Sequence, residues 1–408
     1  MDTFDGYRRP DGRIGIRNIV AVVPLSVAVS AVATRIAREG PERAHATPHQ
    51  LSADAPDATL EQTRRVLEGV ATNPNVAGAV LVELGTERVD GEGIADAVAA
   101  AGRPVEILSV RECGGTAAAV ETGVELVDDL AAETADARRE SADVSELVLG
   151  VECGGSDATS GLAANPSVGN ACDRLVDAGG TATFSETPEF IGAEHILAER
   201  CADSEVREKL LAYVDRREAT AELMGADLRG AQPSPGNQEG GLTTIEEKSL
   251  GAISKGGTTP VQDIVPYGSD LPVGGGLVLM DTPGYDIESV TGKVAGGAQL
   301  VIFTTGRGST TGNPIAPVIK VCGNPQTWDR MASNMDVNAS TIVTGDDLED
   351  VGERIYETVL ETASGRPTAA EVRGLREFAI NELQPNELGY FDGEGDGETV
   401  GSEEVSRS

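Results

Sequence analysis

The sequence predicts an α/β protein made of two Rossmann-like domains, each a parallel sheet with crossover helices. The first observation behind this prediction is that short β-like runs alternate with helical patterns along nearly the whole chain. The second is that these runs are continuously apolar and end near Gly or Pro, as buried central strands do. We expect domains over residues 1–142 and 143–389, followed by a disordered acidic tail over residues 390–408.

The first domain is expected to follow a polar, arginine-rich opening segment. Its expected strands cover residues 19–24, 79–84 and 105–110. Its expected helices cover residues 30–39, 59–71, 93–101 and 117–139. Strand, helix and strand in repeated order favour parallel strands that are joined by helices.

The second domain repeats this alternation from about residue 144. Its expected strands cover residues 147–151, 181–185, 277–280, 300–304 and 318–321. Its expected helices cover residues 166–177, 193–202, 204–224, 245–253, 287–294, 325–335 and 346–364. Residues 230–242 break the pattern with two Pro and four Gly, which predicts either a linker or an active-site loop.

The charge of the chain is strongly negative, with 67 acidic against 32 basic residues and a formal net charge of −35. Acidic residues are spread along the chain and nearly all basic residues are Arg, which indicates a halophilic protein of a salt-rich cytoplasm. A surface of this sign excludes nucleic acid as a natural partner. Four of the five Lys lie between Lys248 and Lys320, either as ordinary surface residues or because a substrate anion requires them.

The chain shows no sign of export or of membrane insertion. The first ten residues are polar and charged, unlike a signal peptide, and no apolar run is long enough to cross a bilayer. The five Cys are odd in number and form no CxxC pair, which favours reduced thiols. We therefore expect a cytoplasmic protein with no membrane partner.

The most informative motif occurs twice. Residues 110–116 read VRECGGT and residues 151–157 read VECGGSD, each at the end of a predicted strand. Ligands of open α/β sheets bind at the carboxyl ends of strands, and paired glycines let backbone N–H groups approach them closely. Both Glu-Cys tips are therefore candidate site residues; the alternative is a structural carboxylate beside a buried thiol.

The order of several motifs resembles that of the altronate/galactarate dehydratase family of sugar-acid lyases, to about residue 380. The motifs are GYRRPDGRIGIRN at 6–18, ECGGSD at 152–157, SETPE at 185–189, GGLTTIEEKS at 240–249, MDTPG at 280–284, TTGRG at 304–308 and PVIK at 317–320. The resemblance implies a hydro-lyase that dehydrates an aldonic or aldaric acid, of altronate or galactarate type, to a 2-keto-3-deoxy acid. It also implies a divalent metal, Fe²⁺ before Mn²⁺ or Mg²⁺, and sugar-acid catabolism.

Two departures from the family pattern leave alternatives open. Only five residues precede Gly6, so the small SAF-type domain that longer members carry is either missing or supplied by a separate small subunit. The early Cys-containing turns of the family are replaced by residues 45–52 and 84–87, which contain no Cys. Some relatives split sulfolactate with a large and a small subunit, so a sulfo-lyase is one alternative. A non-catalytic sugar-acid binding protein is another. We also expect a homo-oligomer.

Dehydration of a 2,3-dihydroxy acid needs a base for the C2 proton, an acid for the departing hydroxide and cations for the carboxylate. The candidate catalytic residues are Glu152, Glu186 and Lys248. The candidate metal ligands are Cys153, Cys113, Glu112 and, because the family places site residues nearby, His49. The candidate substrate-binding residues are Ser156, Asp157, Asn237, Thr243, Thr244, Thr282, Arg307 and Lys320. For several of these the alternative role is a turn cap or a solvated helix face.

Overall fold

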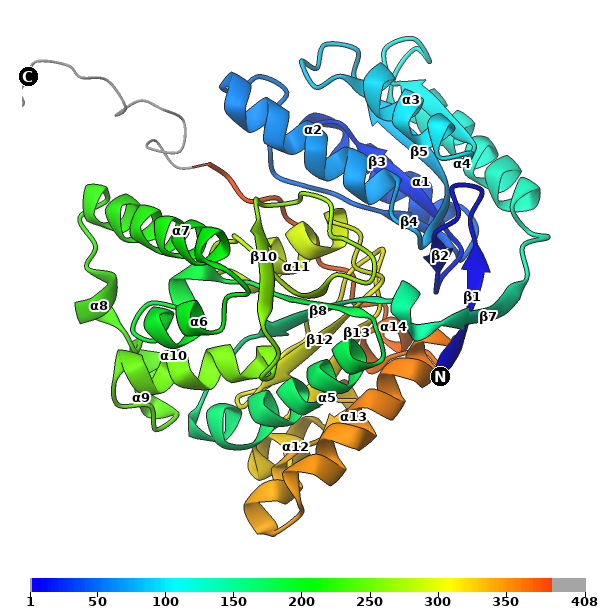
Figure 1. The fold of residues 1–408 in the computed structure, drawn as a ribbon. Coiled ribbons are helices and arrows are strands. Elements are labelled where there is room, and N and C mark those ends of the chain that lie inside the picture. Colours follow the sequence, from blue (N-terminus) through cyan, green and yellow to red (C-terminus); the bar gives the residue numbers. More distant parts are fainter. Residues whose placement is uncertain (1, 384–408) are drawn as a thin grey trace, which may run out of the picture.

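The computed structural model describes residues 2–383. It confirms the predicted α/β class, with two parallel sheets that are covered by helices (Figure 1). The expected disordered tail from residue 390 lies outside the described residues, and the expected domain limits stay predictions. No helix of the described part is both long and apolar enough to cross a membrane.

The first unit is a four-stranded parallel sheet with the strand order β4-β3-β5-β6. Its strands are β3 (Ile19–Pro24), β4 (Ala44–Ala46), β5 (Val76–Glu83) and β6 (Val105–Ser109). Its helices are α1 (Val27–Glu39), α2 (Asp57–Ala71), α3 (Gly91–Ala100) and α4 (Thr116–Glu133). Val22 packs with the apolar side chains of α1 and α4, whereas Val23 packs with those of α2 and α3. Helices therefore cover both faces, as the continuously apolar strands predict.

The second unit is a seven-stranded parallel sheet with the strand order β10-β11-β9-β8-β12-β13-β14. Its strands are β8 (Val148–Cys153), β9 (Thr181–Phe184), β10 (Val261–Val265), β11 (Gly276–Met280), β12 (Leu300–Thr305), β13 (Val318–Cys322) and β14 (Val337–Asn338). The chain runs from β8 to β9 on one side and later returns to β12 on the other. The carboxyl end of β8 is therefore a topological switch point, where α/β proteins bind ligands.

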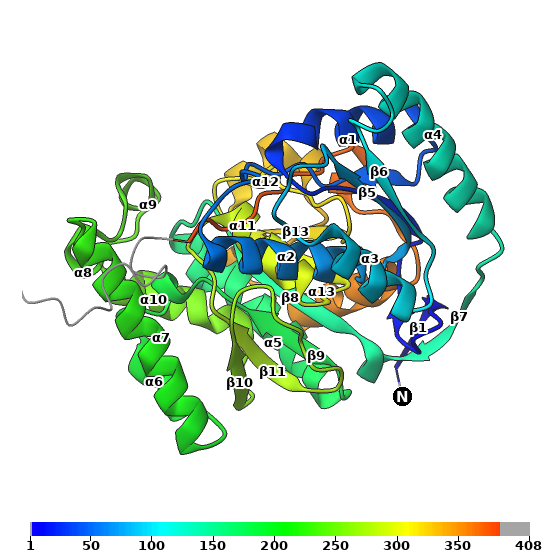
Figure 2. The same cartoon turned by 90° about the horizontal axis from the view of Figure 1, so that it is seen from above.

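The helices of the second unit are α5 (Asn165–Asp177), α6 (Glu194–Glu199), α7 (Ser204–Leu223), α8 (Leu228–Ala231), α9 (Pro235–Glu239), α10 (Ile245–Ile253), α11 (Asp286–Ala295), α12 (Pro325–Met331), α13 (Leu348–Ala363) and α14 (Ala369–Val372). Helix α11 packs against α2 of the first unit (Figure 2). The approach is close because Gly69 faces the carbonyl of Ala295, where a Cβ would lie 2.1 Å from the oxygen. One hydrophobic cluster consequently runs through both units.

A third, antiparallel sheet was not predicted. It consists of β1 (Thr3–Arg8), β2 (Ile14–Gly15) and β7 (Arg139–Asp143). The helix expected over residues 117–139 ends at Glu133, and its last expected residue, Arg139, pairs with β1 instead. Strand β1 buries only Phe4 and Gly6 in a polar segment, so its two-residue period carries a weak hydrophobic signal.

The arginine-rich motif at residues 6–18 joins distant parts of the chain. Arg17 pairs with Glu371 at 2.7 Å and donates to the carbonyls of Thr362 and Arg366 at 3.0 Å. Arg9 is buried, and its guanidinium donates to the carbonyl of Pro74 at 2.7 Å and to the Asn18 side chain at 2.8 Å. These arginines therefore have structural partners within the fold.

Replacing Arg9 should destabilise the protein markedly. In Arg9→Met the buried carbonyl of Pro74 loses its donor, so we expect the free energy of unfolding to fall by about 3 kcal/mol. Urea unfolding at constant salt measures this change. Arg38→Met is the control, because the Arg38 side chain is 74% exposed and should change stability by less than about 0.5 kcal/mol. Equal effects of the two substitutions would contradict the structural role of Arg9.

Candidate functional site

A cavity of about 260 Å³ opens at the carboxyl end of β8, at the switch point of the large sheet. Its lining residues are Cys153, Gly154, Gly155, Ser156, Glu186, Glu189, Gln232, Ser234, Asn237, Lys248, Gly284 and Asp286. A larger cavity, of about 490 Å³, lies at the opposite ends of β8 and β12, but Cys and Lys are absent from its lining residues. The smaller cavity therefore has the chemistry of a reaction site.

Residues 230–242 form one wall of this cavity through Gln232, Ser234 and Asn237. The Asn237 side chain donates to the carbonyl of Ser156 at 3.0 Å, which ties this wall to the turn after β8. Of the two interpretations of this glycine-rich segment, the active-site loop describes its position better than a linker does.

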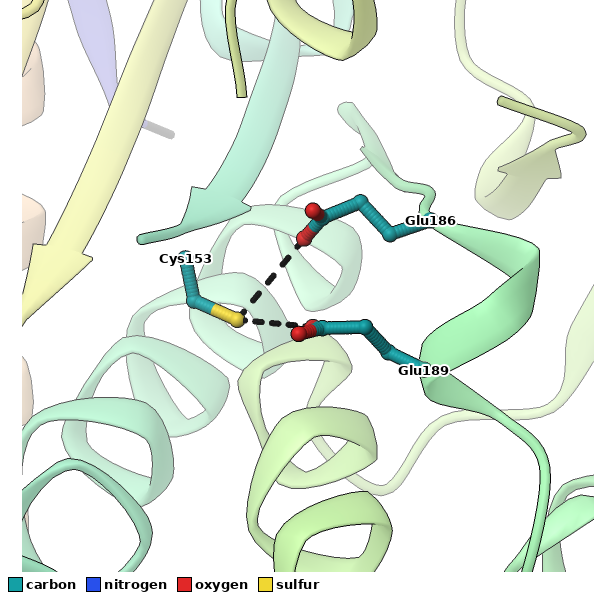
Figure 3. A group of neighbouring side chains, drawn as sticks. All are labelled: Cys153, Glu186 and Glu189. Atoms are coloured by element: carbon teal, nitrogen blue, oxygen red, sulfur yellow. Dashed lines mark hydrogen bonds between the residues drawn. The ribbon is translucent and has the colours of Figure 1, made fainter. Parts of the chain in front are cut away.

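Glu186 has an unusual backbone. It is the one non-glycine residue of the described chain with a positive φ, at 70°, and lies just after β9. A left-handed conformation is unfavourable for a side chain with a Cβ and commonly marks functional sites. Thr282 holds it there, because its hydroxyl oxygen accepts a hydrogen bond from the Glu186 N–H at 2.8 Å. This turn directs the Glu186 carboxyl group back toward β8 (Figure 3).

A buried ammonium group lies at the centre of the site. The Lys255 Nζ is 2.9 Å from the Sγ of Cys153, 3.0 Å from Oε2 of Glu186 and 3.3 Å from Oε2 of Glu189. The Cys153 thiol in turn lies 3.0 Å from Oε2 of Glu189 (Figure 3). The Lys255 side chain is fully buried. We call these four residues the Lys255 cluster.

A second buried ion pair lies beside the Lys255 cluster, and its carboxyl group, on Glu152, shares a hydrogen bond with Glu186. Lys293, on α11, pairs with Glu152, and neither side chain is exposed to solvent. The Lys293 ammonium also donates to the hydroxyl groups of Ser185 and Ser289. Removing either charge would leave the other buried without its partner, so the pair constrains β8 and α11 to one arrangement.

Two groups of the site hold their protons. Burial raises the pKa of Glu186 well above its usual range, and the negative charges of Glu152 and Glu189 raise it further. The protonated Glu186 shares a hydrogen bond with Glu152. Burial likewise raises the pKa of Cys153, with Glu189 adding to the shift. Both shifts favour the protonated form, a neutral carboxyl group and a neutral thiol.

Two other carboxyl groups stay ionised because of the lysines. Burial opposes the ionisation of Glu189, but Lys255 and Lys248 outweigh it and lower the pKa of Glu189 to about 2. Burial also opposes the ionisation of Glu152, yet Lys293 holds its pKa below the usual range. Each ionised carboxylate of the site thus lies next to an ammonium group: Glu152 next to Lys293, and Glu189 next to Lys255 and Lys248.

The Lys255 cluster has the donors of a metal site but already contains a cation. The side chains of Cys153, Glu186 and Glu189 could ligate a divalent transition metal by type and proximity. A metal bound to all three would lie about 2.0–2.3 Å from each donor atom, in the space that the Lys255 ammonium fills. As arranged, the residues do not fit a metal at this position unless Lys255 leaves it.

The cavity brings together part of the predicted site. Ser156, Glu186, Lys248 and Cys153 line it, and Asn237 joins them from the loop. The Lys248 ammonium lies 3.6 Å from Oε1 of Glu189 and donates to the Gln232 side chain at 3.2 Å, with its side chain 15% exposed. Lys248 is therefore the lysine that reaches the cavity surface. Glu152 lies behind the cavity wall, paired with Lys293.

Other predicted substrate-binding residues have partners within the fold. Asp157 is buried and accepts hydrogen bonds from Ser160 N–H and from the Asn324 side chain. Arg307 is half exposed and donates to the carbonyl of Gly236 at 2.7 Å. Thr244 caps α10, and the exposed Thr243 pairs with Glu247 of the same helix. Thr282 supports the Glu186 turn. None of these side chains lines the cavity.

The remaining candidates lie elsewhere. Cys113 and Glu112 follow β6 at the carboxyl end of the smaller sheet, and Cys113 packs with its hydrophobic cluster. Both ring nitrogens of His49 have backbone partners, the Pro24 carbonyl and the Leu51 N–H, which leaves neither for a metal. Lys320 is buried and donates to the Thr311 carbonyl at 3.0 Å. The structure therefore does not gather these residues around Cys153.

The site includes residues that the sequence reasoning did not select: Glu189, Lys255, Lys293 and Asp286. Glu189 belongs to the SETPE motif, and Lys255 and Lys293 belong to the group of lysines between residues 248 and 320. Three of the five lysines of the chain, Lys255, Lys293 and Lys320, are fully buried. The grouping of lysines between residues 248 and 320 was the sequence signal for these residues. Their burial cannot be deduced from their positions in the sequence.

Comparisons with known proteins agree with the motif order. The family model described as D-galactarate/altronate dehydratase, C-terminal, matches residues 144–386, and the second domain of D-galactarate dehydratase/altronate hydrolase matches residues 6–135. The chain is 40% identical to the (2R)-sulfolactate sulfo-lyase subunit beta of Chromohalobacter salexigens, over 93% of this chain and 97% of that protein. It is 32% identical to altronate dehydratase of Bacillus subtilis, over 93% and 77% of the two chains. It is 34% identical to galactarate dehydratase (L-threo-forming) of Escherichia coli, over 89% and 73%.

Removing the Lys255 ammonium should open the cluster to a metal. We expect Lys255→Ala to bind Co²⁺ at least about tenfold more tightly than the unchanged protein, because a unit charge within hydrogen-bond distance is worth more than about 1.4 kcal/mol. Anaerobic titration, followed by the thiolate-to-cobalt charge-transfer band, measures this binding.

The double variant Lys255→Ala/Cys153→Ser is the matched control and should lack that band, since its hydroxyl group replaces the thiol. A band of equal strength and affinity in the unchanged protein would show that Lys255 does not occupy the metal position.

Proposed function

This chain belongs to the altronate/galactarate dehydratase family of lyases, and from this premise we propose that it cleaves the C3–sulfur bond of (2R)-sulfolactate. The observation that carries the proposal is the 40% identity to a sulfo-lyase subunit beta over 97% of that protein. The dehydratases are 30–34% identical and matched over 73–77% of their length. The alternative expected from the sequence is thus better supported than the main expectation, a sugar-acid hydro-lyase.

The proposed reaction is a β-elimination. A base takes the proton from C2, the C2–H electron pair forms the C2=C3 double bond, and the C3–S pair leaves with sulfite. The resulting enolpyruvate becomes pyruvate when a proton is added to C3 and the hydroxyl group loses its proton. Sulfite leaves as a stable anion, so this reaction depends less on an acid than the expulsion of hydroxide does.

The cavity suits a small dianion. Lys248 supplies a cation at its surface, and Ser156, Gln232, Ser234 and Asn237 supply polar groups around it. Lys255 and Lys293 offset the charges of Glu189 and Glu152, which lowers the negative potential that a carboxylate and a sulfonate meet on entering. We assign Lys248 to the substrate carboxylate or sulfonate.

A hydro-lyase acting on a sugar acid is the second candidate, and one observation favours it. The Glu186 carboxyl group lines the cavity, and burial raises its pKa well above the usual range, which favours the protonated acid. Expulsion of hydroxide needs such an acid at C3. The two candidates therefore share the C2 proton abstraction and differ in the group that leaves C3.

A companion subunit is part of the proposal, because the sulfo-lyase relative is named as a subunit beta. We propose that the companion is the small SAF-type subunit expected from the sequence. A homo-oligomer, an Fe²⁺ cofactor and a salt-rich cytoplasm stay predictions.

The direct test offers the substrates side by side. The chain is incubated anaerobically at high salt with (2R)-sulfolactate, altronate or galactarate, with and without the companion subunit and added Fe²⁺. Sulfite is measured with a thiol-exchange reagent, and keto acid by a coupled dehydrogenase.

We expect sulfite and pyruvate in equal amounts from sulfolactate. A keto acid from a sugar acid without sulfite from sulfolactate would replace the proposal with the hydro-lyase. Binding of these acids without any product would indicate the non-catalytic binding protein.

Lys248→Gln should raise the KM for sulfolactate by at least about tenfold, because a charge-assisted hydrogen bond contributes about 1.5–3 kcal/mol. Steady-state kinetics at fixed salt measures the change. Lys209→Gln is the matched control, since Lys209 pairs with Asp263 on the outside of α7 and does not line the cavity. An unchanged KM in Lys248→Gln would remove Lys248 from the substrate site.

A further inference from the structure

One carboxyl group of the cavity has no role in the ion pairs described above. Asp286 begins α11, in the loop that follows β11, and lines the cavity together with Lys248 and Glu186. Its carboxyl group has no side-chain or ion-pair partner within residues 2–383, unlike those of Glu152, Glu186 and Glu189. A half-buried carboxyl group that faces a cavity, with its own backbone N–H as its hydrogen-bond donor, has lone pairs available to a ligand.

The first glycine of the ECGG motif makes room for this group. A Cβ on Gly154 would lie 2.2 Å from Oδ2 of Asp286 and 2.5 Å from the Phe303 ring. Any other residue at position 154 would therefore push Asp286 away from the end of β8. The backbone thus places the Asp286 carboxyl group directly over the turn that follows Cys153.

The surroundings of Asp286 suit proton transfer near neutral pH. Burial raises the pKa of Asp286 to about 7, and the negative charges of Glu152 and Glu189 contribute, while Lys255 acts in the opposite direction. Lys248 and Glu186 line the same cavity. A base works best when its pKa lies near the working pH.

The other acidic groups of the cavity are less suited to accept a proton. Glu189 has a pKa of about 2 and is a weak base. The raised pKa values of Glu186 and Cys153 favour their protonated forms, which cannot accept a proton. Among the described residues that line the cavity, Asp286 combines an accessible carboxylate with sufficient basicity.

We propose that Asp286 is the catalytic base that removes the C2 proton of the substrate. This inference rests on the proposed elimination. The C2 proton moves to the Asp286 carboxylate, the C2–H electrons form the double bond, and the C3–S pair leaves with sulfite. The protonated Asp286 then delivers its proton to C3 of enolpyruvate, while the hydroxyl proton passes to sulfite or water. The carboxylate is regenerated without any further reactant.

The variant Asp286→Asn tests this role. We expect kcat with sulfolactate to fall on the order of 10²–10⁴-fold, because the amide cannot accept the proton. In the unchanged protein kcat/KM should decrease as the pH falls below about 7, where Asp286 becomes protonated. This decrease of kcat/KM at low pH should be absent from the residual activity of Asp286→Asn. Asp286→Glu should restore part of kcat.

Two further variants separate chemistry from folding. Glu288→Gln changes a carboxylate on the same helix, outside the cavity, and should leave kcat and the pH profile unchanged. Gly154→Ala should lower kcat more than it alters KM, since it displaces Asp286. Thermal unfolding midpoints of all variants show whether the fold is kept.

The outcomes distinguish this inference from the proposed function. Suppose that Asp286→Asn turns over sulfolactate with a normal kcat and with the same decrease of kcat/KM at low pH. This result would overturn the role of Asp286 but not the proposed sulfo-lyase activity. If the unchanged protein dehydrates only a sugar acid, the proposed substrate falls, and the same variants measured with that acid decide on Asp286. No turnover of any of these acids would overturn both.

Discussion

Two buried lysines constrain the structure on which the site depends. An isolated ammonium group in a protein interior is strongly unfavourable, so each buried lysine requires an anionic partner in a fixed position: Glu189 for Lys255 and Glu152 for Lys293. Lys293 holds Glu152 at the end of β8, and Lys255 holds Cys153, Glu186 and Glu189 around one point. In a protein with a formal charge of −35, these cations are kept inside, where they decide which carboxyl groups stay ionised.

The backbone near these charges also positions the side chains of the site. Glu186 adopts a left-handed conformation that Thr282 stabilises, and Gly154 leaves space that only a glycine can leave beside Asp286. Both features lie at the switch point of a parallel sheet, where loops from neighbouring strands converge. The fold therefore supplies the location, and a few special residues supply the geometry.

Much of the fold and one part of the site could be predicted from the sequence. Continuously apolar runs predict the buried strands, and the motif that contains Cys153 indicated a site at the end of β8. The twin motif at Cys113 shows the limit, because the sequence does not say which strand ends share a sheet. Strand β7 was not predicted because it follows a helical pattern and lies in a polar segment. The role of Lys255 depends on three partners far away in sequence, and only the folded chain brings them together.

The central claim is that the Lys255 ammonium, and not a metal ion, occupies the point between Cys153, Glu186 and Glu189. Anomalous diffraction from crystals grown anaerobically with Co²⁺ tests it directly. We predict that Lys255 Nζ contacts all three donor atoms and that no anomalous peak lies within bonding distance of them. A Co²⁺ ion bound to Cys153 and seen as an anomalous peak, with the Lys255 side chain turned away, would contradict this claim.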